Sequence, residues 1–441
     1  MFSSLLFALL EQISGNSMSL EGSFDVALSP GHTVDEFLME FQTAVANLPP
    51  GEMLKLSVCD DDTDNPQFVC AVLADPGASR ICAFEWWYYG SEDMVFITEL
   101  LCTNCPYLVW IRIHFPHQSA LDFNTSFLEF NNNAVGNTKL KALDLMACSQ
   151  GDFPRFFNAL KQSQVREMDL CACESPEFFQ GLAGYLPCDL LVKLGITIGD
   201  RENLADTVAF LATCSRLTDL RFSYYGFHHP QDVFACIPAS VTRLQLFGCR
   251  FFDESYDWSF LRESRVRELV LTVLVGVDGD RLGRALQDRG TGLDLLDLFN
   301  CNFASDCLSA VGALVARIKK LRIEGCEVDV AFLREVGLAL KDANSELRDL
   351  SLPLDDNTAR GVETHVLPAL RHSNCQLQKL ELFSELPAHR QRREEILQEF
   401  SRICHRRALL VLLQGQQLRR LANSLRRLPV EMIRLVAKMV I

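Results

Sequence analysis

A short pattern of alternating apolar residues recurs along most of this chain. In VTRLQLFGC (241–249), Leu244 and Leu246 stand two residues apart among polar neighbours, and a cysteine follows three residues later. Seven related stretches lack the cysteine, beginning at Ile81, Leu108, Leu191, Leu217, Val266, Leu347 and Leu377. Five others end in a cysteine, at Cys59, Cys148, Cys173, Cys301 and Cys326.

The copies also keep a period. Their central apolar residues are 54, 84, 111, 143, 168, 194, 220, 244, 269, 296, 321, 350 and 380, with gaps of 24 to 32 residues. Self-similarity at such a period is typical of solenoids and other repeat architectures. The pattern therefore predicts one stacked array rather than a set of unrelated globular domains.

Each repeat reads as a short strand followed by a loop and a helix. Alternation with period two predicts a strand with one buried face, and segments 202–214, 305–318 and 330–343 carry apolar residues at helical spacing. In the second of these, Ser305 and Asp306 stand where an N-cap belongs and Ile318 is its last apolar position. One such unit cannot bury its apolar face alone, so neighbouring units must stack.

The pattern resembles the leucine-rich-repeat family, whose core motif is L-x-x-L-x-L-x-x-N/C-x-L. The copies that end in cysteine, together with CPYLVWIRI (105–113), resemble the cysteine-containing, ribonuclease-inhibitor-like branch. This resemblance implies an α/β solenoid shaped as a horseshoe, with parallel strands on the concave face, helices on the convex face and helical caps. It also implies that the repeat cysteines point inward and pack.

Three segments follow from these patterns. Residues 1–50 are expected to form an N-terminal helical cover, with a degenerate strand at 23–29 and a helix at 33–48. Residues 51–385 hold about 13 repeats. Residues 386–441 are expected to form a basic helical cap, beginning with a long helix at 386–413.

Charge is distributed unevenly along the chain. Residues 386–441 carry a net charge of +8 and residues 1–385 carry −23. An acidic body repels phosphates and so disfavours nucleic-acid binding, whereas it favours a protein partner of basic character. No apolar run has the roughly 18 to 20 residues needed to cross a bilayer, so no membrane role is expected.

The 17 cysteines show no regular pairing pattern. The first residues, MFSSLLFALLEQIS, lack a basic start and a cleavage site, and we expect an amphipathic helix there rather than a signal peptide. Buried thiols in a reducing compartment fit both observations, so a cytoplasmic or nuclear location is predicted.

Catalytic and metal sites are disfavoured. Cys102, Cys105, His114 and His117 offer zinc donors, but their spacing is shorter than in zinc fingers and the repeat register separates them. The chain has no G-x-S-x-G, phosphate-loop or dinucleotide-binding motif. We expect no catalytic residue, no metal and no cofactor; a thiol enzyme or a hydrolase is the alternative of a different class.

Binding residues are expected on the exposed face of the strands, where mixed charge and aromatic side chains favour contact with a protein. Lys55, Glu85, Lys320, Glu324, Lys379 and Glu381 also alternate with the core residues. The candidate residues are Trp87, Arg112, His114, Asp144, Glu167, Asp169, Asp219, Arg221, Arg243, Gln245, Phe247, Asp297, Phe299 and Arg322.

The last 14 residues, LPVEMIRLVAKMVI (428–441), resemble the first helix of an F-box. F-box proteins with such repeats serve as substrate receptors of ubiquitin ligases, so the resemblance implies ligase subunits as partners. A complete F-box is longer and usually precedes the repeats. A cap helix is therefore expected here, and an adaptor function is the alternative to a general binding scaffold.

Overall fold

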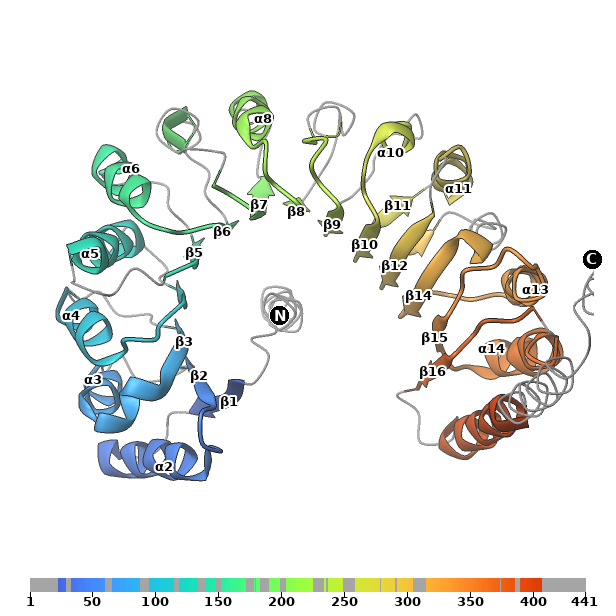
Figure 1. The fold of residues 1–441 in the computed structure, drawn as a ribbon, viewed down its shortest axis with the longest axis horizontal. Coiled ribbons are helices and arrows are strands. Elements are labelled where there is room, and N and C mark those ends of the chain that lie inside the picture. The colour runs from blue at the N-terminus through green and yellow to red at the C-terminus, as the bar shows by residue number, and fades with distance from the viewer. Residues whose placement is uncertain are drawn as a thin grey trace, which may run out of the picture. The chain divides into compact units, whose positions relative to one another are not determined.

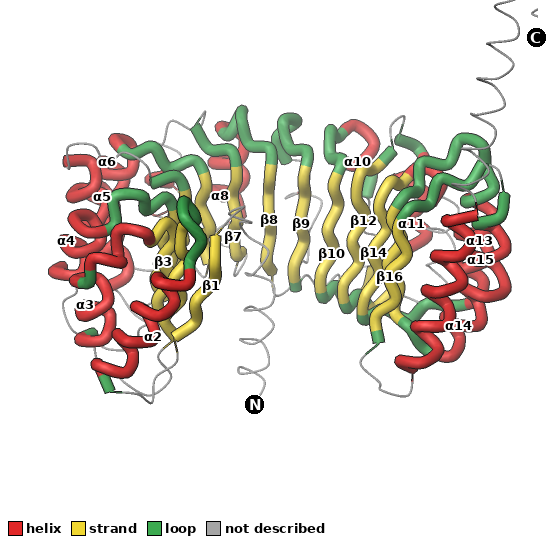
Figure 2. The backbone as a smooth tube through the Cα atoms, turned by 60° about the horizontal axis from the view of Figure 1, so that its bottom comes forward, coloured by secondary structure: helices red, strands yellow, loops and turns green. Residues whose placement is uncertain are grey.

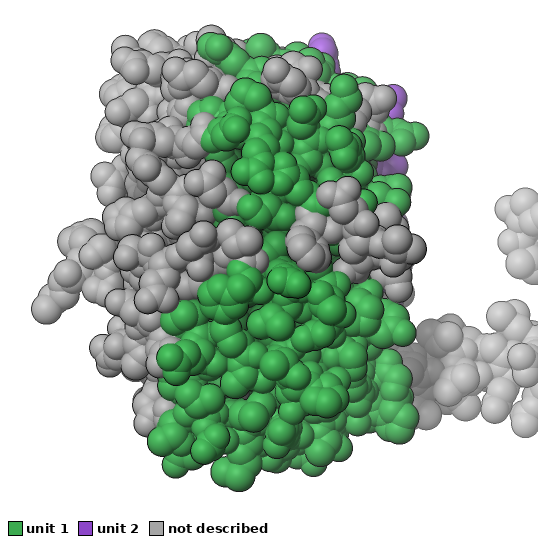
Figure 3. Space-filling model, turned by 90° about the vertical axis from the view of Figure 1, so that its left-hand side faces the viewer, with its two compact units in different colours: residues 1–225, 232–241 green, residues 226–231, 242–441 purple. Residues whose placement is uncertain are grey.

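The computed structural model describes the backbone of residues 23–28 and most of the chain between residues 33 and 406. The described ranges are 33–59, 66–87, 95–114, 119–133, 140–146, 152–171, 178, 180–182, 190–198, 204–224, 234, 237–248, 258–277, 279–289, 292–303, 315–372, 374–384 and 389–406. They fall into two compact units, residues 1–225 with 232–241 and residues 226–231 with 242–441 (Figure 3).

Unit 1 contains a parallel sheet in which strand order follows chain order (Figure 1). Its strands are β1 (Ser23–Leu28), β2 (Met53–Cys59), β3 (Ile81–Trp87), β4 (Trp110–His114), β5 (Ala142–Met146), β6 (Glu167–Cys171), β7 (Lys193–Ile198) and β8 (Asp219–Tyr224). Helices lie on one face of this sheet (Figure 1). They are α2 (Val34–Asn47), α3 (Gln67–Ala74), α4 (Val95–Asn104), α5 (Ser119–Asn133), α6 (Phe153–Gln162) and α8 (Leu204–Thr213), with a short 3₁₀ turn at Pro76–Arg80.

Unit 2 repeats the same plan, and Figure 2 shows its strands side by side. Its main sheet runs β9 (Arg243–Phe247), β10 (Glu268–Thr272), β12 (Leu293–Phe299), β14 (Ile318–Glu324), β15 (Asp349–Pro353) and β16 (Lys379–Phe383). A second ladder pairs β11 (Val275–Val277) with β13 (Asn302–Phe303). The helices are α10 (Phe260–Glu263), α11 (Gly279–Gln287), α13 (Val330–Ala339), α14 (Asp356–Gly361) and α15 (Leu367–Ala369); a π-helical turn (Val362–Val366) joins the last two, and Val315–Arg317 is 3₁₀.

The predicted repeat register is confirmed in twelve of the thirteen copies. In unit 1 the central residue Phe84 pairs with Ile111, and the row continues through positions 143, 168, 194 and 220. In unit 2 the row runs through positions 244, 269, 296, 321, 350 and 380. These side chains are buried against the helices and form the core of each unit.

The first copy is shifted by two residues from the predicted register. Leu56, not Leu54, pairs with Phe84, and an irregularity between Leu54 and Lys55 in the β2–β3 ladder places Leu54 opposite Ile81. Both leucines are buried, at 0% and 1% exposure, so alternation alone could not decide between them. The degenerate strand predicted at 23–29 is confirmed as β1, which pairs with β2.

The predicted helices are largely confirmed. Helix α2 begins after Thr33, whose side chain and that of Glu36 form a reciprocal capping box, and it buries Phe37 and Phe41. Asp329 caps α13 by accepting a hydrogen bond from the Phe332 amide. Among the described residues, no helix has the length and apolar character needed to span a membrane.

The helix predicted at 305–318 is wrong at its end. Ile318 opens β14 and pairs with Leu293 of β12, because ladder hydrogen bonds outweigh the helical spacing at this position. The proposed caps Ser305 and Asp306 lie outside the described residues.

Candidate protein-binding surface

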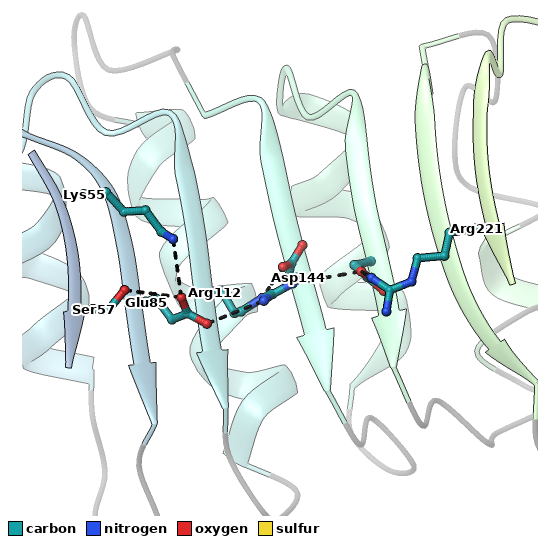
Figure 4. Close-up of polar contacts among 7 residues, drawn as sticks. Lys55, Ser57, Glu85, Arg112, Asp144 and Arg221 are labelled. Carbon is teal, nitrogen blue, oxygen red and sulfur yellow. Dashed lines mark hydrogen bonds and ion pairs between the residues drawn. The ribbon is translucent and has the colours of Figure 1, made fainter. Parts of the chain in front are cut away.

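The face of each sheet that points away from the helices carries the predicted binding residues. In unit 1, one register row on this face links β2 to β8. We call this row the ion row, and it contains Ser57, Glu85, Arg112, Asp144, Asp169, Gly195 and Arg221. Figure 4 shows its side chains reaching along the sheet from strand to strand. The repeat fold thus aligns residues that are far apart in sequence.

Arg112 lies at the centre of the ion row. Its Nε donates a hydrogen bond to Asp144, its Nη1 lies 3.5 Å from Glu85 Oε1, and its Nη2 lies 4.0 Å from Asp169 Oδ2. Burial by itself lowers the pKa of the Arg112 guanidinium. The carboxylates of Asp144, Glu85 and Asp169 raise it by more, so the net shift of the pKa is upward. Arg112 therefore stays charged and is stabilised by several carboxylates at once.

The row holds three acids and two arginines, and its central side chains are largely removed from solvent. Glu85, Arg112 and Asp144 are exposed by only 8%, 6% and 7%. The pKa of Asp144 is raised to about 6. Burial is the main cause, Arg112 opposes the rise, and the charge of Asp169 adds to it. These side chains are bonded to one another, so their first role is to join adjacent strands.

Trp110 lies beside the ion row on the same face. It is buried at 4% exposure, packs with Ala83 and Ala142 of the flanking strands, and shares this cluster with Cys82. The Lys55 ammonium and the Arg112 guanidinium each lie 5.5 Å from the centre of its ring. Small residues on both sides let the indole lie against the sheet under two cations, which is a favourable cation–π arrangement.

Arg221 closes the row on the other side. Its Nη1 lies 3.4 Å from Asp169 Oδ2, although strand β7 lies between their own strands. The intervening residue is Gly195, and a Cβ atom there would approach Asp169 Oδ1 to 2.6 Å. The missing side chain of Gly195 therefore leaves the space that Asp169 occupies.

The equivalent face of unit 2 is more open. Its ion pairs are Arg322–Glu324 at 2.6 Å, Lys379–Glu381 at 2.7 Å, Arg243–Glu268 at 3.6 Å and Lys320–Asp349 at 3.7 Å. Side-chain exposure reaches 62% at Lys320 and is 38% at Arg243, against 7% at Arg112 in unit 1. Exposed pairs of this kind contribute little to stability, so their charges remain available to a partner.

One register row on the strand face of unit 2 contains three phenylalanines. Phe247, Thr272, Phe299, Glu324, Pro353 and Phe383 stand in register there. Phe247 is buried, whereas Phe299 and Phe383 are half-buried, and the Arg322 guanidinium lies 5.4 Å from the Phe383 ring centre. Half-buried rings next to exposed charges are typical of protein-binding surfaces.

Asp297 differs from the other charged residues of this face. Its Oδ1 is buried and has no hydrogen-bond partner, and no ion pair to it lies within 4.0 Å among the residues that the structure describes. Burial raises the pKa of Asp297 to about 6; Arg322 lowers it, Glu324 raises it and Arg243 lowers it.

A shallow pocket of about 460 Å³ lies where the strands of unit 2 begin. Lys319 bonds Asp294 there at 2.6 Å, so its walls carry both signs of charge. The lining residues are Glu268, Asp294, Leu295, Lys319, Lys320, Arg348, Asp349 and Gln378. The pocket extends the mixed-charge surface from the strand face to the edge of the sheet.

Four further predicted binding residues lie at the ends of strands in unit 1. Glu167 and Asp219 are half-buried at the start of β6 and β8, and burial raises the pKa of Glu167. Trp87 and His114 end β3 and β4, and their side chains lie outside the described part. Four further residues lie on this face and were not predicted from the sequence as binding residues: Ser57, Trp110, Ser351 and Phe383. Counting alternate positions outward from each core leucine could have found them.

Two repeat cysteines pack beneath the loops. The residue after β12 and after β14 is left-handed (Asn300 φ 49°, Gly325 φ 64°), and it turns the next side chain inward. Cys301 and Cys326 are accordingly 4% and 6% exposed, and the Cys326 sulfur accepts a hydrogen bond from the Cys301 amide at 3.2 Å. Cys59, Cys148, Cys173 and Cys249 have side chains outside the described residues.

The thiols of Cys102, Cys105 and Cys301 are protonated and buried, which matters for the thiol-enzyme and zinc-site alternatives. Burial raises the pKa of Cys102 and of Cys105 to about 12, so neither is a thiolate at neutral pH. The pKa of the Cys301 thiol is raised mainly by its hydrogen bond with Cys326, and burial raises it as well. The side chains of His114 and His117 are not described, and the described residues contain no cluster of three or more potential metal ligands.

The beginning of the basic C-terminal segment packs against the preceding part of unit 2. Residues 390–406 are helical and bury Ile396 and Ile403 at 2% and 4% exposure. Arg392 bonds Glu363 of the π-helical turn at 2.5 Å, and Arg371 lies 3.4 Å from Glu399 of the helix. The segment 407–441, including the F-box-like stretch, lies outside the described residues.

The register, the alternating parallel strands and helices, and the inward cysteines define an α/β solenoid of the leucine-rich-repeat type. No protein-family model and no curated protein match the chain. Among solved structures it is similar to one chain in a crystal structure of the Rad7 and Elc1 complex in yeast. That likeness has a TM-score of 0.42 and 13% identity, over 83% of this chain and 90% of the other.

A second similar structure is the crystal structure of a TLR13–ssRNA13 complex. Its TM-score is 0.29 and its identity 13%, over 79% of this chain and 66% of the other. Both scores are low, so the fold assignment rests on the strands and helices described above.

Proposed function

We propose that this protein is a non-catalytic scaffold that binds a protein partner through the strand face of unit 2. The observation that carries this proposal is the difference between the two units. The central charges of unit 1 are buried and bonded to each other, whereas those of unit 2 are half-exposed beside Phe299 and Phe383. A partner can reach the second set without breaking a buried network.

The composition of the face supports protein as the ligand. Rings flanked by arginine and by paired charges supply both apolar area and hydrogen-bond groups, and a few such residues commonly carry most of the binding energy. Three of the predicted binding residues are partly exposed here: Phe299 offers apolar area, and Gln245 and Arg322 offer hydrogen-bond groups. The inward cysteines further support a ribonuclease-inhibitor-like repeat.

Affinity purification with matched variants tests the proposal. Partners recovered with the full chain should be lost with Phe299→Ala and Phe383→Ala, with at least a tenfold fall in recovery. The control is Leu338→Ala, which changes a 53% exposed leucine on helix α13. Equal recovery with all three variants would contradict the proposed surface.

A ubiquitin-ligase adaptor is the narrower alternative, and it depends on the Leu-Pro-x-Glu stretch at Leu428–Glu431. The deletion that tests it should begin at residue 407 and not at 386, because helix 390–406 buries Ile396 and Ile403. Recovery of ligase subunits with the full chain but not with this deletion would support the adaptor. Recovery with neither would contradict it.

We propose a reducing compartment, cytoplasmic or nuclear, for this function. Five cysteines of the described part, Cys70, Cys82, Cys105, Cys301 and Cys326, are thiols and not disulfide halves, which is usual for cysteines in such compartments.

A further inference from the structure

We propose that Asp297 is the anchor of the binding face and that it accepts a basic side chain, arginine or lysine, from the partner polypeptide. The inference rests on the proposed function and names the chemistry of the partner. Unit 1 provides an internal comparison for it.

In unit 1, the sheet satisfies its own carboxylate. Asp144 stands in the ion row next to Arg112 of the preceding strand, and the two are hydrogen-bonded. In unit 2, the residue that stands next to Asp297 on the preceding strand is Val270, which has no donor. The face of unit 2 therefore lacks the arginine that would correspond to Arg112.

The following strand does not replace it. Arg322 is in register with Asp297, but its guanidinium bonds Glu324 at 2.6 Å and lies over the Phe383 ring. Its Nε makes no hydrogen bond. On the described strand face of unit 2, the other acids form ion pairs, and Asp297 is the one acid without an ion pair within 4.0 Å.

A half-buried carboxylate without an ion pair is unfavourable in the free protein, and a partner's cation that approaches its exposed side would relieve that cost. Phe299 lies two residues along β12 on the same face and is half-buried, so an apolar residue next to the cation would pack on its ring. The net charge of −23 on residues 1–385 would attract a basic segment at long range. The expected ligand is thus an extended segment with a basic residue beside an apolar one.

A random peptide library displayed on phage and selected against the full chain tests this inference. We expect the enriched peptides to share an arginine or lysine. A synthetic peptide from the selection should bind the Asp297→Asn variant at least tenfold more weakly than the unchanged protein. Replacing the basic residue of the peptide by glutamine should cause a similar loss, and combining both changes should cost little more than either one.

Two further variants make the result specific. Asp349→Asn changes a carboxylate on the same face that is already paired with Lys320, and it should alter peptide affinity by less than about twofold. Asp297→Asn should also be at least as stable as the unchanged protein, since it removes an unsatisfied buried charge. A loss of affinity with intact stability separates recognition from unfolding.

The outcomes distinguish the inference from the proposed function. Peptides that Phe299→Ala weakens but Asp297→Asn does not would overturn the role of Asp297 and leave the binding face in place. Peptides without a basic residue would do the same. A selection that returns no peptide sensitive to either variant would overturn both.

Discussion

The guanidinium of Arg221 lies 3.4 Å from the carboxylate of Asp169, although a complete strand separates the two residues in the sheet. Adjacent strands are about 4.8 Å apart, so a side chain that reaches the second strand must pass over a position without bulk. Gly195 provides that position. The contact therefore depends on the residue between the two partners as much as on the partners themselves.

Replacing Gly195 with alanine should destabilise unit 1 by about 1–3 kcal/mol, because the new Cβ would lie 2.6 Å from Asp169 Oδ1. Urea denaturation followed by tryptophan fluorescence measures the change. In an Asp169→Ala background the same substitution should be neutral or slightly stabilising, since the obstructing carboxylate is gone. An equal loss in both backgrounds would show that the carboxylate is not the cause.

Arg112→Met should cost about 3–5 kcal/mol of stability, because it leaves the buried carboxylates of Glu85 and Asp144 without their shared cation. The comparison is Arg243→Met, which breaks a pair with Glu268 whose side chains are 38% and 40% exposed, and which should cost less than about 1 kcal/mol. Denaturation midpoints of the two variants give the answer. Similar values would contradict the difference we infer between the two faces.

Asp297 should make stability depend on pH in a defined direction. Its pKa rises from 3.8 to about 6 on folding, because burial outweighs the attraction of Arg322 and Arg243, and Glu324 adds to the rise. The folded state then binds the proton more tightly than the unfolded state. The stabilising contribution is thus complete below about pH 4 and is lost as the pH rises through 6.

Asp297→Asn should remove this loss, so the variant should be about 1–3 kcal/mol more stable than the unchanged protein at pH 7. At pH 3.5 the two should differ much less. Asp144 shifts in the same direction, so the informative quantity is the difference between the two proteins at each pH, measured by urea denaturation. A difference that stays constant from pH 3.5 to 7 would exclude a raised pKa at Asp297.

Native-state alkylation should separate the thiols by burial. Cys70 and Cys404 are half-buried and should react first. Cys102, Cys105, Cys301 and Cys326 should react only through opening of the structure, because they are buried and the pKa of Cys102 and Cys105 rises to about 12. Mass spectrometry at timed intervals gives the order. Rapid modification of Cys301 or Cys326 would argue against their packing role.

The helix at 390–406 should stabilise unit 2 through its apolar contacts more than through its charges. Ile396→Ala should cost about 2–4 kcal/mol, since the side chain is 2% exposed. Arg392→Ala, which breaks the exposed pair between this helix and Glu363 of the π-helical turn, should cost less than about 1 kcal/mol. Equal effects, measured by thermal unfolding, would indicate that the helix is held mainly by charge.

Most of the fold follows from the sequence, because strand alternation and repeat period are both visible in the order of the residues. The candidate face could also be named, since each residue that alternates with a core leucine must lie on the other side of the sheet. The exceptions have local causes. The order Leu54, Leu56, Val58 offers two equivalent registers, and only the ladder with Phe84 chooses between them.

The sequence by itself determined the repeat, its strands and the side of the sheet on which Arg112, Asp144 and Asp297 lie. The tertiary structure decided what each of these charges does there. Asp144 has an arginine next to it on the neighbouring strand, while Asp297 has Val270 on one side and an Arg322 bonded to Glu324 on the other. Pairing across a sheet depends on residues about 25 to 30 positions apart, and their packing alone determines whether a charge is buried in a pair or left to bind a partner.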